Sequence, residues 1–303
     1  MPSPSPHAVS LRQLQYVVAV AELCSFRRAA ERCRVAQPSL SAQVAAAEDA
    51  LGVQLFERDS HGVRVTLAGE ALVVRARRVL READDLVDAS RRLQDPLAGT
   101  LRVGVIPTVA PYLLPEIVPA LHAAFPRLTL AWVEDKTEVL LRRVEDGTLD
   151  AALLAVVPEL GDLVQVPVRT DPFVLAMPKS HPLAKGRGAV DADALAGLHV
   201  LLLDDGHCFR TQALAVCTAA RAEEDELRAT SLPTLAQMVS TGAGVTLLPQ
   251  MSVETEARRA KLVTRALRDP APSRTIALAW RHTSAVAAAL GEVAKVIASG
   301  GAR

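Results

Sequence analysis

Aromatic residues and long hydrophobic runs are both scarce in this sequence. Phe, Trp and Tyr make up 3% of the 303 residues, and no run approaches the roughly 18 uncharged apolar residues that a membrane-spanning helix needs. The first ten residues, "MPSPSPHAVS", lack the basic and apolar regions of an export signal and predict a disordered tail. We therefore expect a globular cytoplasmic protein that binds no membrane and keeps its thiols reduced.

Cysteine is scarce as well, and the chain carries no net charge. Four cysteines in 303 residues exclude a small scaffold held together by disulfides. Cys24 and Cys33 have no His or Cys at metal-ligand spacing, so we interpret them as core thiols and expect no metal and no cofactor. The chain has 34 Lys and Arg residues and 34 Asp and Glu residues. The net charge therefore neither supports nor excludes binding to nucleic acid, and the distribution of the charges along the chain has to decide.

The segment up to residue 66 has the pattern of a helix-turn-helix followed by a wing. Apolar residues recur at spacings of three and four through 11–23, 25–33 and 39–51, which predicts three short helices. Two short strands around a turn at 59–62 predict the wing, after which Thr66 is expected to cap the next helix. We therefore predict a winged helix-turn-helix DNA-binding domain over residues 1–66, including the disordered tail.

Basic and amide side chains gather in this domain. Five arginines fall within residues 12–34 against two glutamates, although the whole chain is neutral. Amide and hydroxyl groups at the start of the third helix can bind base edges, and arginines on the wing can bind phosphates. The residues expected to contact double-stranded DNA are Arg12, Arg27, Arg28, Gln37, Pro38, Ser39, Ser41, Gln43, Arg58 and Arg64. The pattern alone leaves open an alanine-rich three-helix bundle with solvated polar faces.

Residues 67–95 predict one long helix. Leu72, Val79, Leu86 and Leu93 recur every seven residues, which is the spacing of a helix that pairs with another copy. We expect this helix to mediate dimerisation, and the alternative is a solvent-exposed linker.

Residues 96–303 alternate between strand and helix patterns, which predicts an α/β regulatory domain with a mainly parallel sheet. The first five elements form a βαβαβ unit, and a second α/β unit follows. A late strand and the last helix return to the first unit. We therefore expect lobe I to comprise 100–170 and 274–303 and lobe II to comprise 171–273, with a cleft between them that binds a small ligand.

The chain resembles LysR-type transcriptional regulators along nearly its whole length, beginning with the stretch "FRRAAERCRVAQPSLSAQVAAAEDALGVQLFER". The resemblance narrows to the hydrogen peroxide-sensing OxyR subfamily through "IPTVAPYLLPEIVPALHAAFPRL", "DDGHCFRTQALAVC", "RATSLPTLAQMVSTGAGVTLLP" and "SRTIAL". It implies a two-lobed, periplasmic-binding-protein-like regulatory domain in a homodimer or homotetramer that is not an enzyme. It also implies an activator that works with RNA polymerase on antioxidant genes, responds to hydrogen peroxide, and is reset by glutaredoxin or thioredoxin.

Cys208 and Cys217 lie in the stretch "DDGHCFRTQALAVC", which predicts a helix beginning near Cys208 after a Gly-His turn. The amides and dipole at the start of this helix favour a thiolate at Cys208, and His207 can add positive charge or a hydrogen bond. Nine helical residues separate the thiols by about 13 Å along the axis and place them on opposite sides. A disulfide needs Cα atoms within about 7 Å, so its formation must unwind the helix.

Together with the resemblance, this spacing predicts a redox switch. Attack of the Cys208 thiolate on the O–O bond of peroxide gives a sulfenic acid, which Cys217 resolves to an intramolecular disulfide. The structural alternative is that both are ordinary buried cysteines.

The resemblance also implies the other residues of the peroxide site. Thr108 and Thr137 are expected to offer hydroxyls to the peroxide, although either also suits a helix N-cap. Arg274 is expected to neighbour Cys208, where a permanent cation would lower the pKa of the thiol. Arg228 and Ser231 of "RATS" are further candidates for the lining of the same cleft.

Two other functions remain open from the sequence. One is a LysR-type regulator that binds a small carboxylate metabolite in the cleft, with incidental cysteines. The other is a thiol peroxidase, an enzyme whose chemistry has no use for the helix-turn-helix segment.

Overall fold

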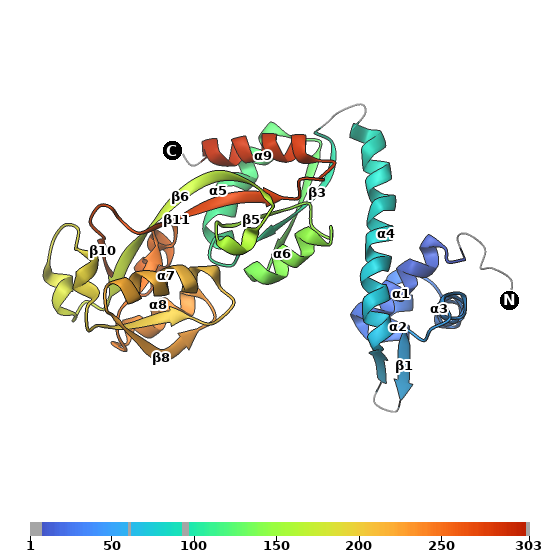
Figure 1. Cartoon of the computed structure of the whole chain (residues 1–303), viewed down its shortest axis with the longest axis horizontal. Coiled ribbons are helices and arrows are strands. Elements are labelled where there is room, and N and C mark those ends of the chain that lie inside the picture. The colour runs from blue at the N-terminus through green and yellow to red at the C-terminus, as the bar shows by residue number, and fades with distance from the viewer. Residues whose placement is uncertain (1–7, 60–61, 93–96, 301–303) are drawn as a thin grey trace. The chain divides into compact units, whose positions relative to one another are not determined.

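A computed structural model gives the conformation of the chain and describes residues 8–59, 62–92 and 97–300. The chain divides into two compact units, residues 1–93 and 94–303 (Figure 1). The first unit has one hydrophobic core and the second has two. None of the helices within the described residues combines the length and the apolarity that crossing a membrane requires.

The first unit consists of α1 (Leu11–Leu23), α2 (Phe26–Cys33), α3 (Gln37–Leu51), β1 (Phe56–Asp59), β2 (Gly62–Val65) and α4 (Leu67–Arg92). Its three short helices and its antiparallel β1–β2 hairpin confirm the predicted helix-turn-helix and wing. The Ser25 hydroxyl caps α2 by accepting from the Arg28 N–H, and Gly52 ends α3 with a φ of 69°. Helix α3 begins at Gln37, with Pro38 in its first turn, where proline is tolerated.

The core of the first unit is formed by side chains from one face of each helix and from the wing. Its buried members include Tyr16, Val17, Val20, Phe26, Ala29, Leu40, Val44, Ala47, Leu55 and Phe56. The rings of Phe26 and Phe56 meet edge to face at 5.9 Å, which joins α2 to β1. Helix α4 starts against the wing, where the Thr66 hydroxyl accepts from the Gly69 N–H at 2.9 Å. Because the apolar face of α3 is used by this core, the opposite, polar face is left outward.

Large apolar side chains are exposed along α4. Val79, Leu86 and Val87 are 46%, 73% and 52% exposed, whereas Leu72 is half-buried. Leu93, the last member of the predicted heptad, lies outside the described residues. The pairing of this helix with a second copy stays a prediction.

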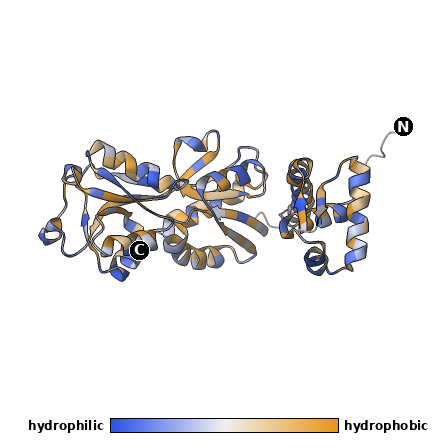
Figure 2. Cartoon of the chain, turned by 90° about the horizontal axis from the view of Figure 1, so that it is seen from below, coloured by the Kyte–Doolittle hydropathy of each residue, from blue (hydrophilic) through white to orange (hydrophobic). Residues whose placement is uncertain are grey.

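The second unit consists of β3 (Gly99–Val105), α5 (Ala110–Ala124), β4 (Leu128–Glu134), α6 (Thr137–Glu145), β5 (Ala151–Ala155), β6 (Val164–Met177), β7 (His199–Leu203), α7 (Cys208–Ala219), β8 (Glu223–Ala229), α8 (Leu232–Ser240), β9 (Thr246–Pro249), β10 (Val263–Ala266), β11 (Ser273–Trp280) and α9 (Ala287–Gly300). Short 3-10 turns lie at Pro158–Leu160, Pro182–Lys185, Ala192–Leu195 and Gln250–Ser252, and a π turn lies at Val253–Ala257. The helices carry both hydrophobic and hydrophilic residues in Figure 2, as expected for helices that cover a core with one face.

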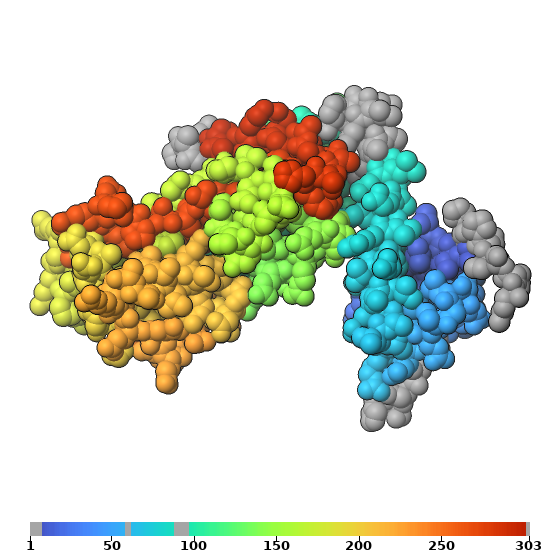
Figure 3. Space-filling view, in the orientation of Figure 1, coloured from blue at the N-terminus to red at the C-terminus, as the bar shows by residue number. Residues whose placement is uncertain are grey.

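One sheet passes through both halves of the second unit in the order β10-β6-β11-β5-β3-β4, with β9 also paired to β6, and β7 and β8 form a separate pair. The first core lies on β3, β5, α5, α6 and α9, and the second lies between β6, β7, β9, α7 and α8. Figure 3 shows the two halves packed against each other without a break. The strands β6 and β11 pass from one core to the other.

The prediction of a parallel sheet is confirmed for the βαβαβ unit formed by β3, β4 and β5 and is wrong for the sheet as a whole. Parallel pairing is confined to β3–β4, β3–β5 and β7–β8 among the described strands. Strand β6 pairs antiparallel with β9, β10 and β11, and β11 pairs antiparallel with β5. The reason is that the chain leaves the first core along β6 and returns to it along β11, in the opposite direction.

Gly69 packs where α4 meets the wing, and a Cβ at this position would clash with the Leu55 carbonyl oxygen. We expect Gly69→Ala to destabilise the first unit by about 1–3 kcal/mol. Gly291, inside α9, has open space around it, so Gly291→Ala is expected to stabilise the second unit by about 0.5–1 kcal/mol.

Urea unfolding distinguishes these two effects. Both tryptophans, Trp132 and Trp280, lie in the second unit, so their fluorescence follows Gly291→Ala, while far-UV circular dichroism follows both variants. Equal midpoints for Gly69→Ala and the parent chain would contradict the packing described at the wing.

Candidate functional site

Cys208 is the first residue of α7 and lies at the boundary between the two cores of the second unit. It is 8% exposed and packs into the first core, whereas Phe209, the next residue, belongs to the second core. His207 is the N-cap residue, and its side chain makes no capping hydrogen bond. The Arg210 N–H donates to the His207 carbonyl at 2.9 Å. The earlier N–H groups of a helix's first turn have no intrahelical acceptor, so those of Cys208 and Phe209 can face negative charge.

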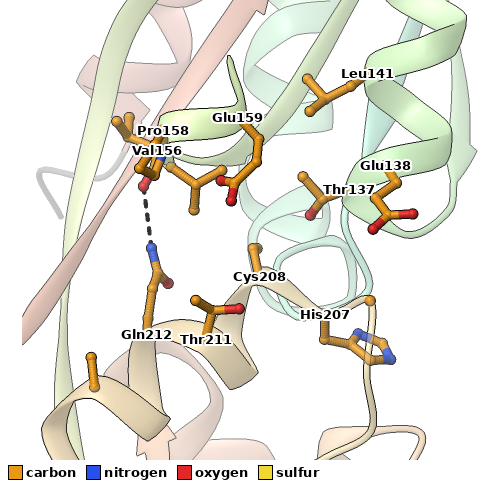
Figure 4. A pocket seen from close by; sticks show the side chains of 13 residues that line it. Thr137, Glu138, Leu141, Val156, Pro158, Glu159, His207, Cys208, Thr211 and Gln212 are labelled. Atoms are coloured by element: carbon orange, nitrogen blue, oxygen red, sulfur yellow. Dashed lines mark hydrogen bonds between the residues drawn. The ribbon is translucent and has the colours of Figure 1, made fainter. Parts of the chain in front are cut away.

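A pocket of about 330 Å³ opens over Cys208 (Figure 4). It is lined by Thr137, Glu138 and Leu141 of α6, by Val156, Val157, Pro158 and Glu159 after β5, and by Gly206, His207, Cys208, Thr211, Gln212 and Ala215 at α7. In Figure 4 the Cys208 side chain points toward Thr137 and Glu159. The pocket therefore brings groups from both halves of the unit to one thiol.

Three buried polar atoms around this pocket have no hydrogen-bond partner: Thr137 Oγ1, Gln212 Oε1 and His207 Nε2. Thr137 is the first residue of α6, and Lys136 is its N-cap, so the Thr137 hydroxyl does not cap the helix. Buried polar atoms without a partner are uncommon and costly. A polar ligand in the pocket can supply the hydrogen bond that the Thr137 hydroxyl lacks.

Burial disfavours the charged form of His207. It lowers the pKa of His207, and the nearby Lys136 ammonium lowers it further, while Asp204 and a hydrogen bond with the Thr230 backbone act in the opposite direction. In Figure 4 the His207 ring points away from Cys208. The positive charge that the sequence allowed for this residue is therefore not favoured at neutral pH, which leaves hydrogen bonding.

Cys217 is a protonated thiol inside the second core. It is 1% exposed, and burial, aided by the Glu224 carboxylate, raises the pKa of Cys217 to about 11. Both Cys208 and Cys217 are free, and α7 is helical from one to the other. Nine residues of helix correspond to about 13 Å of rise, which exceeds the reach of a disulfide.

Arg274 is the central cation of the second unit and is fully buried. Its Nε lies 2.9 Å from Asp171 Oδ2, and it donates to the hydroxyl and the carbonyl of Thr108 at 2.8 and 2.9 Å. Its guanidinium also lies 5.2 Å from the Phe209 ring centroid. Thr108 therefore binds Arg274 instead of capping α5, whose N-cap is Val109, and neither Thr108 nor Arg274 is among the residues that line the pocket.

Arg228 and Ser231 lie outside the pocket lining and have other partners. Arg228 Nη1 lies 3.0 Å from Asp205 Oδ2, and Ser231 is the N-cap of α8. The same Asp205 pairs with Arg210, which also binds Glu224 at 2.8 Å. These four charged residues fasten the start of α7 to β8.

Sequence reasoning missed two hydrogen bonds that join the halves of the unit on either side of Cys208. Lys136 Nζ donates to the Asp205 carbonyl at 2.8 Å, and Gln212 Nε2 donates to the Val156 carbonyl at 3.2 Å. Gln212 follows Cys208 by four residues, so the helical repeat could have predicted that both lie on the same face of α7. Lys136 and Val156 are distant in sequence, and no local pattern indicated them.

The exposed face of α3 carries the polar residues expected to reach DNA. Gln37, Pro38, Ser39 and Gln43 are exposed, and Ser41 is half-buried. Leu40, Val44 and Ala47 are on the buried face. Since α3 is the second helix of the helix-turn-helix, it corresponds to the helix that enters the major groove in such proteins.

The arginines expected to contact DNA differ in whether they bind other side chains of the first unit. Arg12 donates to the Tyr16 hydroxyl at 2.7 Å, and Arg27 makes a loose, exposed pair with Glu31 at 3.8 Å. Arg28 is exposed beside Arg27. Arg58 lies on β1 and Arg64 on β2, so both belong to the wing. The interpretation of Cys24 as a core thiol is wrong, because it ends α1 with an exposed side chain, and Cys33 is only half-buried.

Two family models match the chain. Residues 11–70 match the bacterial regulatory helix-turn-helix of the lysR family, and residues 94–300 match the LysR substrate binding domain. A hydrogen peroxide-inducible genes activator from Pectobacterium carotovorum is 46% identical over 91% of each chain. The DNA-binding transcriptional dual regulator OxyR of Escherichia coli is 44% identical over 95% of each chain.

Solved structures agree with these matches. A full-length OxyR variant from Pseudomonas aeruginosa has a TM-score of 0.72 and 36% identity, covering 96% of this chain and 98% of that one. A hydrogen peroxide-bound OxyR variant from Corynebacterium glutamicum has a TM-score of 0.67 and 35% identity, covering 96% and 92%.

A winged helix-turn-helix joined to a two-lobed α/β unit with a cysteine pocket defines a DNA-binding transcriptional regulator that carries an effector domain. The chain belongs to the LysR family of transcriptional regulators and, within it, to the OxyR subfamily. The family and the fold class predicted from the sequence are thereby confirmed.

The raised pKa of Cys217 predicts its reactivity toward alkylating reagents. In the native, reduced protein at about pH 8, iodoacetamide should modify the exposed Cys24 and leave Cys217 unmodified, because only the thiolate reacts. Labelling of Cys217 should rise as the pH approaches about 11. Peptide mass spectrometry measures both, and urea-unfolded protein serves as the fully labelled control. Fast native labelling of Cys217 at pH 8 would contradict its burial.

Proposed function

We propose that this chain is a cytoplasmic, DNA-binding regulator of antioxidant genes that senses hydrogen peroxide through Cys208 and Cys217. One observation carries the proposal: Cys208 begins a helix and faces a pocket in which the buried Thr137 hydroxyl has no partner. The curated relatives are named hydrogen peroxide-inducible genes activators, and one related structure is of a peroxide-bound OxyR. A regulator responds to this chemistry and does not turn over substrate, so we do not propose an enzyme.

The proposed chemistry has two steps that balance. The Cys208 thiolate attacks one oxygen of hydrogen peroxide, the O–O bond breaks, and hydroxide leaves and takes a proton to become water. Cys208 becomes a sulfenic acid. The Cys217 thiol then displaces its oxygen as a second water, and the S–S bond forms. In this scheme the Thr137 hydroxyl hydrogen-bonds the peroxide, while Thr108 and Arg274 hold the loop and strand behind the site.

Disulfide formation is proposed to act by dismantling α7. The thiols cannot meet while the helix persists, so the bond unwinds it, releases Arg210 and Arg228 from Asp205, and reshapes the surface of this half. A changed contact between subunits of a homodimer or homotetramer would alter half-site spacing on DNA and the contact with RNA polymerase. Glutaredoxin or thioredoxin is the proposed reductant.

The charges at the pocket disfavour a carboxylate metabolite as the effector. None of the described residues that line it is Lys or Arg, and Glu138 and Glu159 stand at its rim. The nearby Lys136 ammonium is already bound to the Asp205 carbonyl. An anion in this pocket would therefore meet two carboxylates, and the neighbouring Lys136 ammonium would have to divide its hydrogen bonds between the anion and the Asp205 carbonyl.

The decisive experiment combines mass spectrometry with footprinting. Brief treatment of the reduced full-length protein with equimolar peroxide should join Cys208 to Cys217, and DNase protection should differ between the reduced and oxidised forms. Cys208→Ser should keep the reduced footprint under peroxide, and Cys24→Ser serves as the matched cysteine control. One footprint shared by the reduced, oxidised and Cys208→Ser forms would refute the switch.

The proposed DNA face separates into phosphate and base contacts. Arg28→Ala should weaken operator and random DNA equally and reduce the salt slope of binding by about one unit. Gln43→Ala should weaken operator binding by about 1–3 kcal/mol and leave random DNA unaffected. Fluorescence anisotropy at several salt concentrations measures both, and the reverse assignment of the two effects would contradict the proposed orientation of α3.

A further inference from the structure

Exposed cations gather beyond the paired ends of β6 and β10 in the second unit. The segments 178–188 and 258–262 contain no Asp or Glu. Met177 pairs with Val263 in the antiparallel ladder, so the residues that follow β6 lie beside those that precede β10 (Figure 1). The exposed cations of the two segments form what we call the basic patch: Lys179, Lys185, Arg187, Arg258, Arg259 and Lys261. None of them lines the cysteine pocket.

Arg265 holds the loop of the basic patch in place from β10. Its guanidinium donates to the backbone carbonyls of Leu183, Arg187 and Gly188 at 3.2, 3.1 and 3.0 Å. A Cβ at Gly186 would clash with the same guanidinium, so the loop backbone packs closely against it. The loop is thereby preorganised, and less backbone entropy is lost when its exposed side chains bind a partner.

The charge of the basic patch is not balanced within the second unit. Among the residues that the structure describes, no carboxylate forms an ion pair with any of the six cations. Of the acids within five residues of the two segments, Asp191 pairs with Arg268 at 3.3 Å and Glu256 is buried, which leaves Asp193 and Glu254 exposed. Six positive charges against two negative charges create a positive potential that attracts anions.

The basic patch lacks the apolar centre that a stable contact with another protein needs. The exposed large hydrophobic residues in the described part of the second unit are Val118, Val156 and Leu227, and none of them lies in the two segments. Protein interfaces are anchored by apolar and aromatic side chains, with charges at the rim. Contacts with the phosphate backbone of DNA need only Lys, Arg and other hydrogen-bond donors. The composition of the patch therefore favours a nucleic-acid backbone as its partner.

We propose that the basic patch binds the phosphate backbone of double-stranded DNA next to the operator, without reading its base sequence. The inference rests on the proposed function of the chain as a DNA-binding regulator. It adds to the helix-turn-helix a second contact, whose strength depends on the length of the DNA and on the salt concentration and not on the operator bases.

The test measures binding of the reduced full-length protein to two duplexes by fluorescence anisotropy. One duplex contains only the operator, as bounded by DNase protection, and the other adds random sequence on both sides. We expect the protein to bind the longer duplex more tightly at low salt. Two additional phosphate contacts steepen the log–log salt dependence by about 1.8, so this advantage should shrink by about tenfold between about 50 and 200 mM salt.

Charge reversal in the loop then assigns the advantage to the basic patch. Lys185→Glu with Arg187→Glu should remove the extra salt slope of the longer duplex and leave the affinity for the operator-only duplex within about twofold. The matched control is Arg142→Glu with Lys295→Glu, which makes the same change in net charge on α6 and α9 of the same unit and should keep the advantage. All four side chains are exposed, and urea unfolding followed by Trp fluorescence checks that each variant is folded.

The outcomes separate this inference from the proposed function. If the longer duplex has no advantage, if the loop variant keeps it, or if the control variant loses it equally, the inference fails and operator binding stands. If the loop variant binds both duplexes as the parent chain does but no longer supports transcription by RNA polymerase in vitro, the patch contacts a protein, which also overturns the inference. If the parent chain binds neither duplex, the proposed function itself is refuted.

Discussion

The buried ion pair between Arg274 and Asp171 holds together the parts of the second unit on which the cysteine site depends. The two residues face each other on β11 and β6, where these strands pass from one core to the other. Their side chains are 0% and 2% exposed, so each charge relies on the other in place of water. Loss of either partner would leave an unpaired buried charge, at a cost of about 3–5 kcal/mol. Through Thr108 and the Phe209 ring, the same guanidinium also fixes the loop after β3 and the first turn of α7.

Two opposing requirements meet in α7. In the proposed switch the helix must be stable enough to hold Cys208 in its pocket, yet it must unwind for Cys208 to reach Cys217. Stability comes from the edge-to-face contact of Phe209 with Phe173 and from the ion pairs of Arg210. Each of these contacts lies in the segment that a disulfide would disrupt. In the proposed switch the oxidised form would lose this aromatic packing and the ion pairs of Arg210, and the free energy of peroxide reduction is the available source.

Local sequence patterns predicted the features of the fold that depend on residues close in sequence. The period of three and four gave α1 to α3 and α7, and the Gly-His turn correctly located the start of the cysteine helix. Patterns did not reveal strand direction, because a strand has the same alternation whichever way it runs. They also did not reveal the pocket walls, since Val156 meets Gln212 only after the chain has folded. Arg228 looked available for the cleft because its partner Asp205 is 23 residues away.

The same structure limits which groups can stabilise a thiolate at Cys208. Burial lowers the pKa of His207 and so disfavours a positive charge on its ring, and the charge of Arg274 is already balanced by Asp171. The Lys136 ammonium is directed to the Asp205 carbonyl. The remaining group that can stabilise negative charge at Cys208 is the start of α7, where no side-chain cap accepts from the first-turn amides. In the proposed switch the helix has two linked roles: its first turn places backbone amides beside Cys208, and its unwinding on oxidation would remove them.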